Sequence, residues 1–161
     1  MTGKTKVPAI EGWFTSDPDR PALLGSRCAS CQAIFFPRET SFCRNPDCQG
    51  REFAEIELSR TGTIWSFTDN RYQPPPPYVS PEPFVPYMIA AVELEAEQMV
   101  VLGQVEPGVD FADLHAGMVV ELVLGPLYED DEHEYLVWRW RPVADQQGAA
   151  TSTRTVEEVS R

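Results

Sequence analysis

Basic residues are scarce in this chain, which carries 13 Lys and Arg side chains against 25 Asp and Glu side chains. The formal net charge is −12, whereas nucleic-acid binders gain most of their affinity by neutralising phosphates with Lys and Arg. A general role on nucleic acid or on anionic membrane surfaces is therefore disfavoured, although a local basic patch can still hold one anionic ligand. The excess of acid is interpreted first as a source of solubility.

Long apolar runs are missing as well. No stretch approaches the roughly 18 consecutive apolar residues of a membrane span. The polar segment 1–6 is not followed by the apolar core of a signal peptide. We therefore expect a cytoplasmic protein with no membrane association. In a reducing compartment, the four cysteines of the chain indicate metal binding more than disulfides.

Catalytic signatures are also few. The two histidines, His115 and His133, have no candidate nucleophile near them in the sequence. The chain lacks a Gly-rich phosphate loop, a nucleophile elbow and a His-rich metal motif. The acidic segment 129–134 is interpreted as a solvated turn. The sequence thus predicts no catalytic residue, and we expect the chain alone to be inactive.

Four cysteines form two pairs, Cys28-x2-Cys31 and Cys43-x4-Cys48, with eleven residues between the pairs. Two thiolates from each pair can converge tetrahedrally on one Zn²⁺, and no cysteine is left over. Four thiolates leave no open position, so the predicted site is structural. Disulfides, a redox-active Cys-x-x-Cys and rubredoxin-like iron are less favoured alternatives that stay open.

After the cysteines the apolar residues alternate with polar ones in short runs, a pattern typical of β-strands. Within 110–117, Asp110 is a fair N-cap and Gly117 a stop, which predicts one or two helical turns. Five strands from Gly62 onward, with this turn between the third and fourth, are typical of an OB-fold barrel. The predicted strand segments are 53–58, 63–68, 87–94, 99–105, 118–124 and 135–141.

The N-terminal part has a different pattern. Ile10, Trp13 and Phe14 fall at helical spacing, which predicts one short amphipathic helix. The segment 69–86 holds seven prolines and is predicted to be a stiff, extended loop. The fold class is therefore mainly β, with a short N-terminal helix, a rubredoxin-like zinc ribbon and a five-stranded OB-fold. The expected divisions are an arm at 1–24, the ribbon at 25–52, the OB-fold at 53–143 and a disordered tail at 144–161.

Four aromatic residues in the predicted strands are candidates for stacking on nucleic-acid bases, as in other OB-folds. They are Trp65, Phe67, Trp138 and Trp140. Because the chain is acidic, we favour the alternative that they form the barrel core or a partner surface.

This order of parts resembles the acyl-CoA-associated OB-fold family, the domain of unknown function numbered thirty-five. The most specific match is the ribbon followed by Gly62-Thr-Ile-Trp-Ser-Phe67. The sequence differs from the family pattern in the proline-rich insert and in the wide Cys43-x4-Cys48 pair. The other matching segments are 23–31, 35–37, 43–48, 86–94 and 114–120.

The resemblance implies a non-catalytic accessory subunit of a thiolase-like acyl-CoA enzyme, either a thiolase or an aldolase. It implies that the catalytic residues lie in the thiolase-like subunit, that the complex is a hetero-oligomer, and that the pathway is lipid or steroid side-chain degradation. The alternatives are a free-standing acyl-CoA-binding module and, from a different class, a single-stranded nucleic-acid binder.

Coenzyme A has a strongly anionic head, so its contact with an acidic chain must be local. We expect Arg71 to bind the head group, with Tyr72 and Tyr78 as stacking surfaces for adenine. We also expect two aromatic stretches to contact the thiolase-like subunit, on the ground that exposed apolar residues mark interfaces. These stretches are Ile10, Trp13 and Phe14, and Tyr78, Phe84, Val85 and Tyr87.

Overall fold

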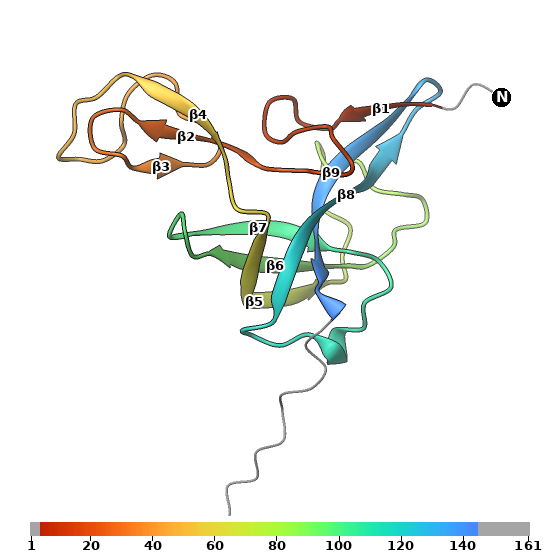
Figure 1. Cartoon of the computed structure of the whole chain (residues 1–161). Helices are drawn as coiled ribbons and strands as arrows, with labels where there is room; N and C mark the ends of the chain where they lie inside the picture. The colour runs from red at the N-terminus through yellow and green to blue at the C-terminus, as the bar shows by residue number, and fades with distance from the viewer. Residues whose placement is uncertain (1–3, 145–161) are drawn as a thin grey trace, which may run out of the picture.

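The computed structural model describes residues 4–144, which form two β-sheets (Figure 1). The smaller sheet has the order β3-β2-β4, and the larger has the order β1-β9-β7-β6-β5-β8. A single turn of 3-10 helix, η1 (Phe111–Asp113), lies between β7 and β8 and is capped by the Asp110 carboxylate. The strands are β1 (Thr5–Pro8), β2 (Leu24–Cys28), β3 (Ile34–Phe35), β4 (Phe53–Glu57), β5 (Thr61–Asn70), β6 (Tyr87–Leu94), β7 (Met99–Val105), β8 (Val119–Glu129) and β9 (His133–Pro142).

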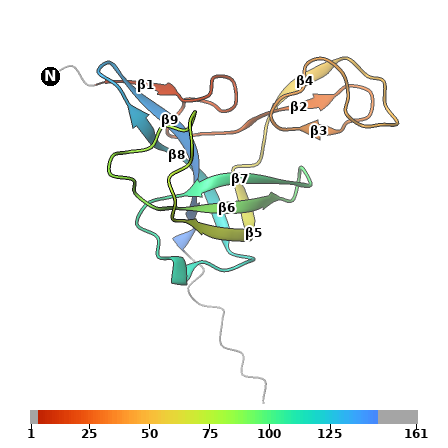
Figure 2. The same ribbon diagram turned by 180° about the vertical axis from the view of Figure 1, so that it is seen from behind.

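The larger sheet closes on itself because β8 pairs with β5 on one side and with β9 on the other. Strands β5 to β9 thus form a five-stranded barrel in which only β7 and β9 run parallel. Figure 2 shows this barrel below the smaller sheet, with β1 lying beside the β8–β9 hairpin. The predicted mainly-β fold with a five-stranded barrel is confirmed.

Two tryptophans from β9 fill the barrel core. Trp140 is fully buried and Trp138 is 8% exposed. Gly103 on β7 provides the room, because a Cβ atom there would lie 2.7 Å from Nε1 of Trp140 and 2.9 Å from Nε1 of Trp138. The Trp138 indole N–H donates to the Leu102 carbonyl at 2.9 Å, which satisfies one buried polar group.

The predicted N-terminal helix is wrong. Residues 5–8 form β1 instead, which pairs in parallel with β9 from His133 to Leu136. The backbone N–H of Thr15 then donates to the carbonyl of Ala22, so this segment bonds to the chain just before β2 rather than to its own preceding turn. Gly12 has a φ of +76°, which interrupts any helical path. Residues 4–144 contain no α-helix.

The aromatics of that segment lie inside the molecule. We call Trp13, Phe14, Phe36 and Trp138 the aromatic junction, because they join the N-terminal segment, the smaller sheet and the barrel. Phe14 is 3% exposed, and its ring meets Trp138 edge-on with centroids 5.8 Å apart. Phe36 meets Trp138 edge-on at 6.0 Å, and Trp13 lies against both rings. The expectation that this stretch forms a partner surface is therefore wrong for Phe14, while Trp13 is half-buried and Ile10 is 38% exposed.

No helix in the described part of the chain is long and apolar enough to cross a membrane. The tail expected at 144–161 lies, apart from Ala144, outside the described residues.

Candidate functional site

The four cysteines come from two turns at one end of the smaller sheet. Cys28 ends β2, and a tight turn then presents Cys31, with Gln32 in the left-handed region at φ 63°. The second pair lies in the long β3–β4 connection, where the backbone N–H of Cys43 donates to the Gly50 carbonyl at 2.8 Å. The left-handed turn at Gln32 shapes the first pair, and the bond between Cys43 and Gly50 closes the turn of the second pair.

The four sulfurs converge on one point. All four Sγ atoms lie within 4.8 Å of one another, with 3.9 Å from Cys28 to Cys48 and 3.5 Å from Cys31 to Cys43. A tetrahedron with Zn–S bonds of about 2.3 Å has edges of about 3.8 Å, which these separations match. The cysteines are free thiols, so the geometry fits a tetrahedral metal site rather than disulfides.

The surroundings of the sulfurs favour thiolate at one turn and resist it at the other. In the metal-free chain the backbone N–H of Cys31 lowers the pKa of the Cys28 thiol to about 7. Burial raises the pKa of Cys43 to about 12. The Gly50 N–H donates to Sγ of Cys48 at 3.3 Å, and a Cβ at Gly50 would come within 2.8 Å of Sγ of Cys28. A bound Zn²⁺ would supply the charge that keeps all four sulfurs ionised.

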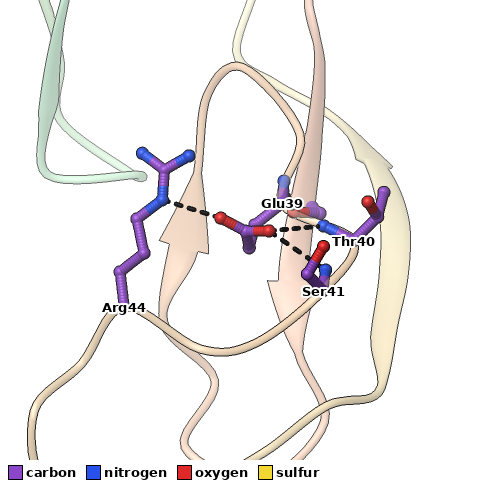
Figure 3. A network of polar contacts seen from close by, with 5 residues as sticks. Glu39, Thr40, Ser41 and Arg44 are labelled. Atoms are coloured by element: carbon purple, nitrogen blue, oxygen red, sulfur yellow. Dashed lines mark hydrogen bonds and ion pairs between the residues drawn. The ribbon is translucent and has the colours of Figure 1, made fainter.

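A carboxylate holds the loop that leads to the second pair of cysteines (Figure 3). The Glu39 side chain is only 11% exposed and accepts hydrogen bonds from the backbone N–H groups of Thr40 and Ser41 and from Nε of Arg44. Its own N–H donates to the hydroxyl of buried Ser26 on β2 at 2.8 Å. These bonds, that from Ser41 foremost, lower the pKa of Glu39 to about 2. The loop is thereby tied to β2 just before Cys43.

A cleft of about 670 Å³ opens at the barrel end beside the proline-rich loop. Its walls come from this loop, from the ends of β6 and β7, from the turn before η1 and from the β8–β9 hairpin. Clefts of this volume are typical of small-molecule sites. The lining side chains include Tyr78, Val85, Gln104, Glu106, Phe111 and Arg139.

The structure separates the three residues predicted to contact coenzyme A. Tyr78 lines the cleft, accepts a hydrogen bond from Gln104 at 3.0 Å and stacks on Tyr87. Burial, and then this neighbouring tyrosine, raise the pKa of Tyr87 to about 12. Arg71 lies outside the cleft, with its side chain 81% exposed and its Nε donating to Asp69 at 2.6 Å. Tyr72 is 69% exposed.

Sequence reasoning missed the cleft's one arginine, Arg139. The available signal was the Trp138-Arg-Trp140 run, in which a charged residue interrupts a strand of large apolar side chains. The predicted stacking aromatics are also divided. Trp138 and Trp140 lie in the core, Phe67 is half-buried against Phe111, and Trp65 is 66% exposed. The aromatic argument for nucleic-acid binding is weakened accordingly.

Two family models match the chain in sequence order. One, described as "ChsH2, rubredoxin-like zinc ribbon domain", matches residues 15–54, and the other, "ChsH2, C-terminal OB-fold domain", matches residues 55–125. The predicted family resemblance is confirmed.

Relatives that match three quarters or more of the chain are found among subunits and scaffold proteins. A "DUF35 domain-containing scaffold protein" of Methanocaldococcus jannaschii is 32% identical over 129 residues, which cover 76% of this chain and 82% of the relative. The "benzoylsuccinyl-CoA thiolase subunit BbsA" of Geobacter metallireducens is 32% identical over 130 residues, 80% of each chain. A solved structure titled "Ltp2-ChsH2(DUF35) aldolase" has a TM-score of 0.57 and 28% identity, covering 84% of this chain and 98% of that one.

Proposed function

Since this chain belongs to the DUF35 family of zinc-ribbon and OB-fold proteins, we propose that it is a non-catalytic accessory subunit of a thiolase-like acyl-CoA enzyme. The observation that carries the proposal is the 80% coverage, in both directions, of a relative described as a thiolase subunit. The aldolase match over 98% of the solved chain supports the same kind of complex. From the family resemblance we propose substrates from lipid or steroid side-chain breakdown.

We propose that the four cysteines bind one structural Zn²⁺, since their separations suit a closed tetrahedral site. Such a site supplies stability in a sheet of only three short strands. We also propose a cytoplasmic location, because four cysteines placed to bind one metal ion suit a compartment in which thiols stay reduced.

For the partner surface we propose the outer face of β5, β6 and β7. Trp65 occupies a bulge in β5 and is 66% exposed, while Leu102 and Val100 on β7 are 62% and 46% exposed. Ser66, the residue next to Trp65, pairs with Ala91 of β6, and Ala91 pairs in turn with Leu102 of β7. Since Ala91 is small, the apolar side chains of β5 and β7 share one surface. A group of exposed large apolar side chains on a sheet typically marks a protein interface.

The test is co-expression of the chain with each thiolase-like protein of the same genome, followed by affinity capture and gel filtration. We expect stoichiometric co-elution, with turnover of an acyl-CoA substrate by the complex and none by this chain alone. A chain that elutes alone from every such co-expression, or that turns over acyl-CoA by itself, contradicts the proposed function.

The interface is tested by replacing Trp65 and Leu102 together with Ser. Since both side chains are exposed, we expect capture to be lost while the zinc content and melting temperature are retained. Val85→Ser, which changes an equally exposed residue of the proline-rich loop, is the matched control. Loss of capture in the control but not in the double variant would move the interface to the loop and leave the accessory function intact.

We propose that Arg71, Tyr72 and Tyr78 contact coenzyme A in the assembled enzyme. In support, the Arg71–Asp69 ion pair is on the surface, and such pairs are weak enough for a phosphate to replace the carboxylate. We expect Arg71→Gln to weaken acyl-CoA affinity by about 1–3 kcal/mol, with exposed Arg51→Gln as the control. Equal affinities for the two variants would remove Arg71 from the site. Binding of acyl-CoA by the chain without any partner would favour the free-standing module instead.

A further inference from the structure

The guanidinium of Arg139 lies against the neighbouring strand β8 at a position where β8 has a glycine and therefore no side chain. Gly125 on β8 lies directly under it, and a Cβ atom there would come within 2.7 Å of Nη1. The Nη2 group donates to the carbonyl of Pro126, also on β8. The side chain is therefore held flat against β8, at the base of the cleft beside the proline-rich loop.

This guanidinium lacks a counter-ion in the part of the chain that the structure describes. Its Nε is buried and has no hydrogen-bond partner, and no carboxylate between residues 4 and 144 forms an ion pair with it. Glu106 is the carboxylate that interacts electrostatically with Arg139, but its Oε2 atom forms an ion pair with Nε of Arg141, at 3.8 Å. A half-buried cation with a free donor gains free energy when an anion completes its coordination.

The remaining walls restrict what that anion can carry. Val85 and Phe111 line the cleft and are 60% and 45% exposed, which provides apolar surface for the body of a ligand. Asp69, Glu106 and Asp110 also line it. These carboxylates repel every anion, and they repel a ligand with several negative charges most strongly. The ligand that fits best therefore carries a single negative charge, placed on Arg139, and an apolar body that covers the wall.

We propose that this cleft binds an amphipathic monocarboxylate, whose carboxylate accepts hydrogen bonds from Arg139 and whose apolar body lies against Val85 and Phe111. The proposal needs neither the thiolase-like subunit nor coenzyme A. It is therefore tested on the isolated full-length chain, and its failure leaves the accessory function untouched.

The first measurement compares 4-phenylbutyrate with its neutral analogue 4-phenylbutanamide by titration calorimetry and by nitrogen-15 NMR of the zinc-loaded chain. We expect saturable binding of the carboxylate, at least about tenfold tighter than the amide, because a charge-assisted bond is worth about 1.5–3 kcal/mol. We also expect the carboxylate to shift the Arg139 Nε–H resonance and the backbone amides of Glu106 and of residues 108–111. Equal binding of both probes, no binding up to the solubility limit, or shifts away from the cleft would overturn the proposal.

The second measurement uses variants. Arg139→Gln should lose the preference for the carboxylate, whereas Arg51→Gln, which changes an exposed arginine in the connection between β3 and β4, should keep it. If Arg139→Gln fails to fold, the contrast between the two probes on the native chain decides alone. If neither probe binds but Arg139→Gln, with its zinc retained, weakens capture of the thiolase-like subunit, the cleft belongs to the protein interface and the proposal is wrong.

Discussion

Phe14 offers the sharpest test of how the N-terminal segment is used, because a helix docked on a partner and a buried irregular segment predict opposite results. The side chain is 3% exposed and contacts Trp138 edge-on. Phe14→Ala should therefore destabilise the isolated chain. If the segment were a free docking arm, the same replacement would leave the stability unchanged.

The magnitude follows from three contributions. Burial of a large apolar side chain is worth about 1.5–3 kcal/mol. The edge-on contact with Trp138 adds about 0.5–1.5 kcal/mol. A remaining cavity costs more, so we expect a total loss of roughly 3–4 kcal/mol, within the usual range of about 3–5 kcal/mol for Phe→Ala in a core. This corresponds to a drop of roughly 10 °C in melting temperature for a domain of this size.

The assay is urea unfolding of the zinc-loaded chain, followed by tryptophan fluorescence, which reports on the aromatic junction directly. Ile10→Ala is the matched control, since that side chain is 38% exposed and should cost less than about 1 kcal/mol. A loss below about 1 kcal/mol for Phe14→Ala as well would refute the burial argument and restore the docking-arm hypothesis.

Three further outcomes are expected. Cys31→Ser should abolish stoichiometric zinc and unfold the smaller sheet, as seen by elemental analysis and hydrogen exchange; full zinc occupancy would contradict a four-cysteine site. Gly103→Ala should lower stability by about 1–3 kcal/mol in the same urea assay, because its Cβ would collide with Trp140; an unchanged midpoint would show that the core has spare room. Hydrogen bonds from the backbone of Glu132 and His133 lower the pKa of Asp130 to about 2 from 3.8. Its stabilisation of the hairpin should therefore be complete above about pH 4 and disappear as the pH falls toward 2, whereas Asp130→Asn should show no such dependence; an NMR titration midpoint near 4 would contradict this.

The barrel strands were predictable because their apolar residues alternate and each strand is bounded by turn residues. Tyr87–Leu94 and Met99–Val105 were placed to the residue. The spacing of the cysteines likewise predicted the metal-binding cluster, since few other kinds of cysteine site use two close pairs with no cysteine left over.

The N-terminal strand was not predictable, because its partner lies at the other end of the chain and a parallel pairing leaves no local sequence mark. The apparent helical spacing of Ile10, Trp13 and Phe14 arises in an irregular segment that turns at Gly12. Arg139 was missed for a related reason: only the fold reveals that β8 carries Gly125 opposite its guanidinium. The domain boundaries and the coenzyme A contacts stay predictions.

The parallel pairing of β1 with β9 has a consequence for synthesis on the ribosome. It joins residue 5 to residue 133, so β1 has no partner strand until nearly the whole chain has emerged. The residues of the smaller sheet, 24–57, emerge much earlier and can take up zinc on their own. We therefore expect the order of assembly to be ribbon first and barrel closure last, with β1 unpaired and open to mispairing in the interval.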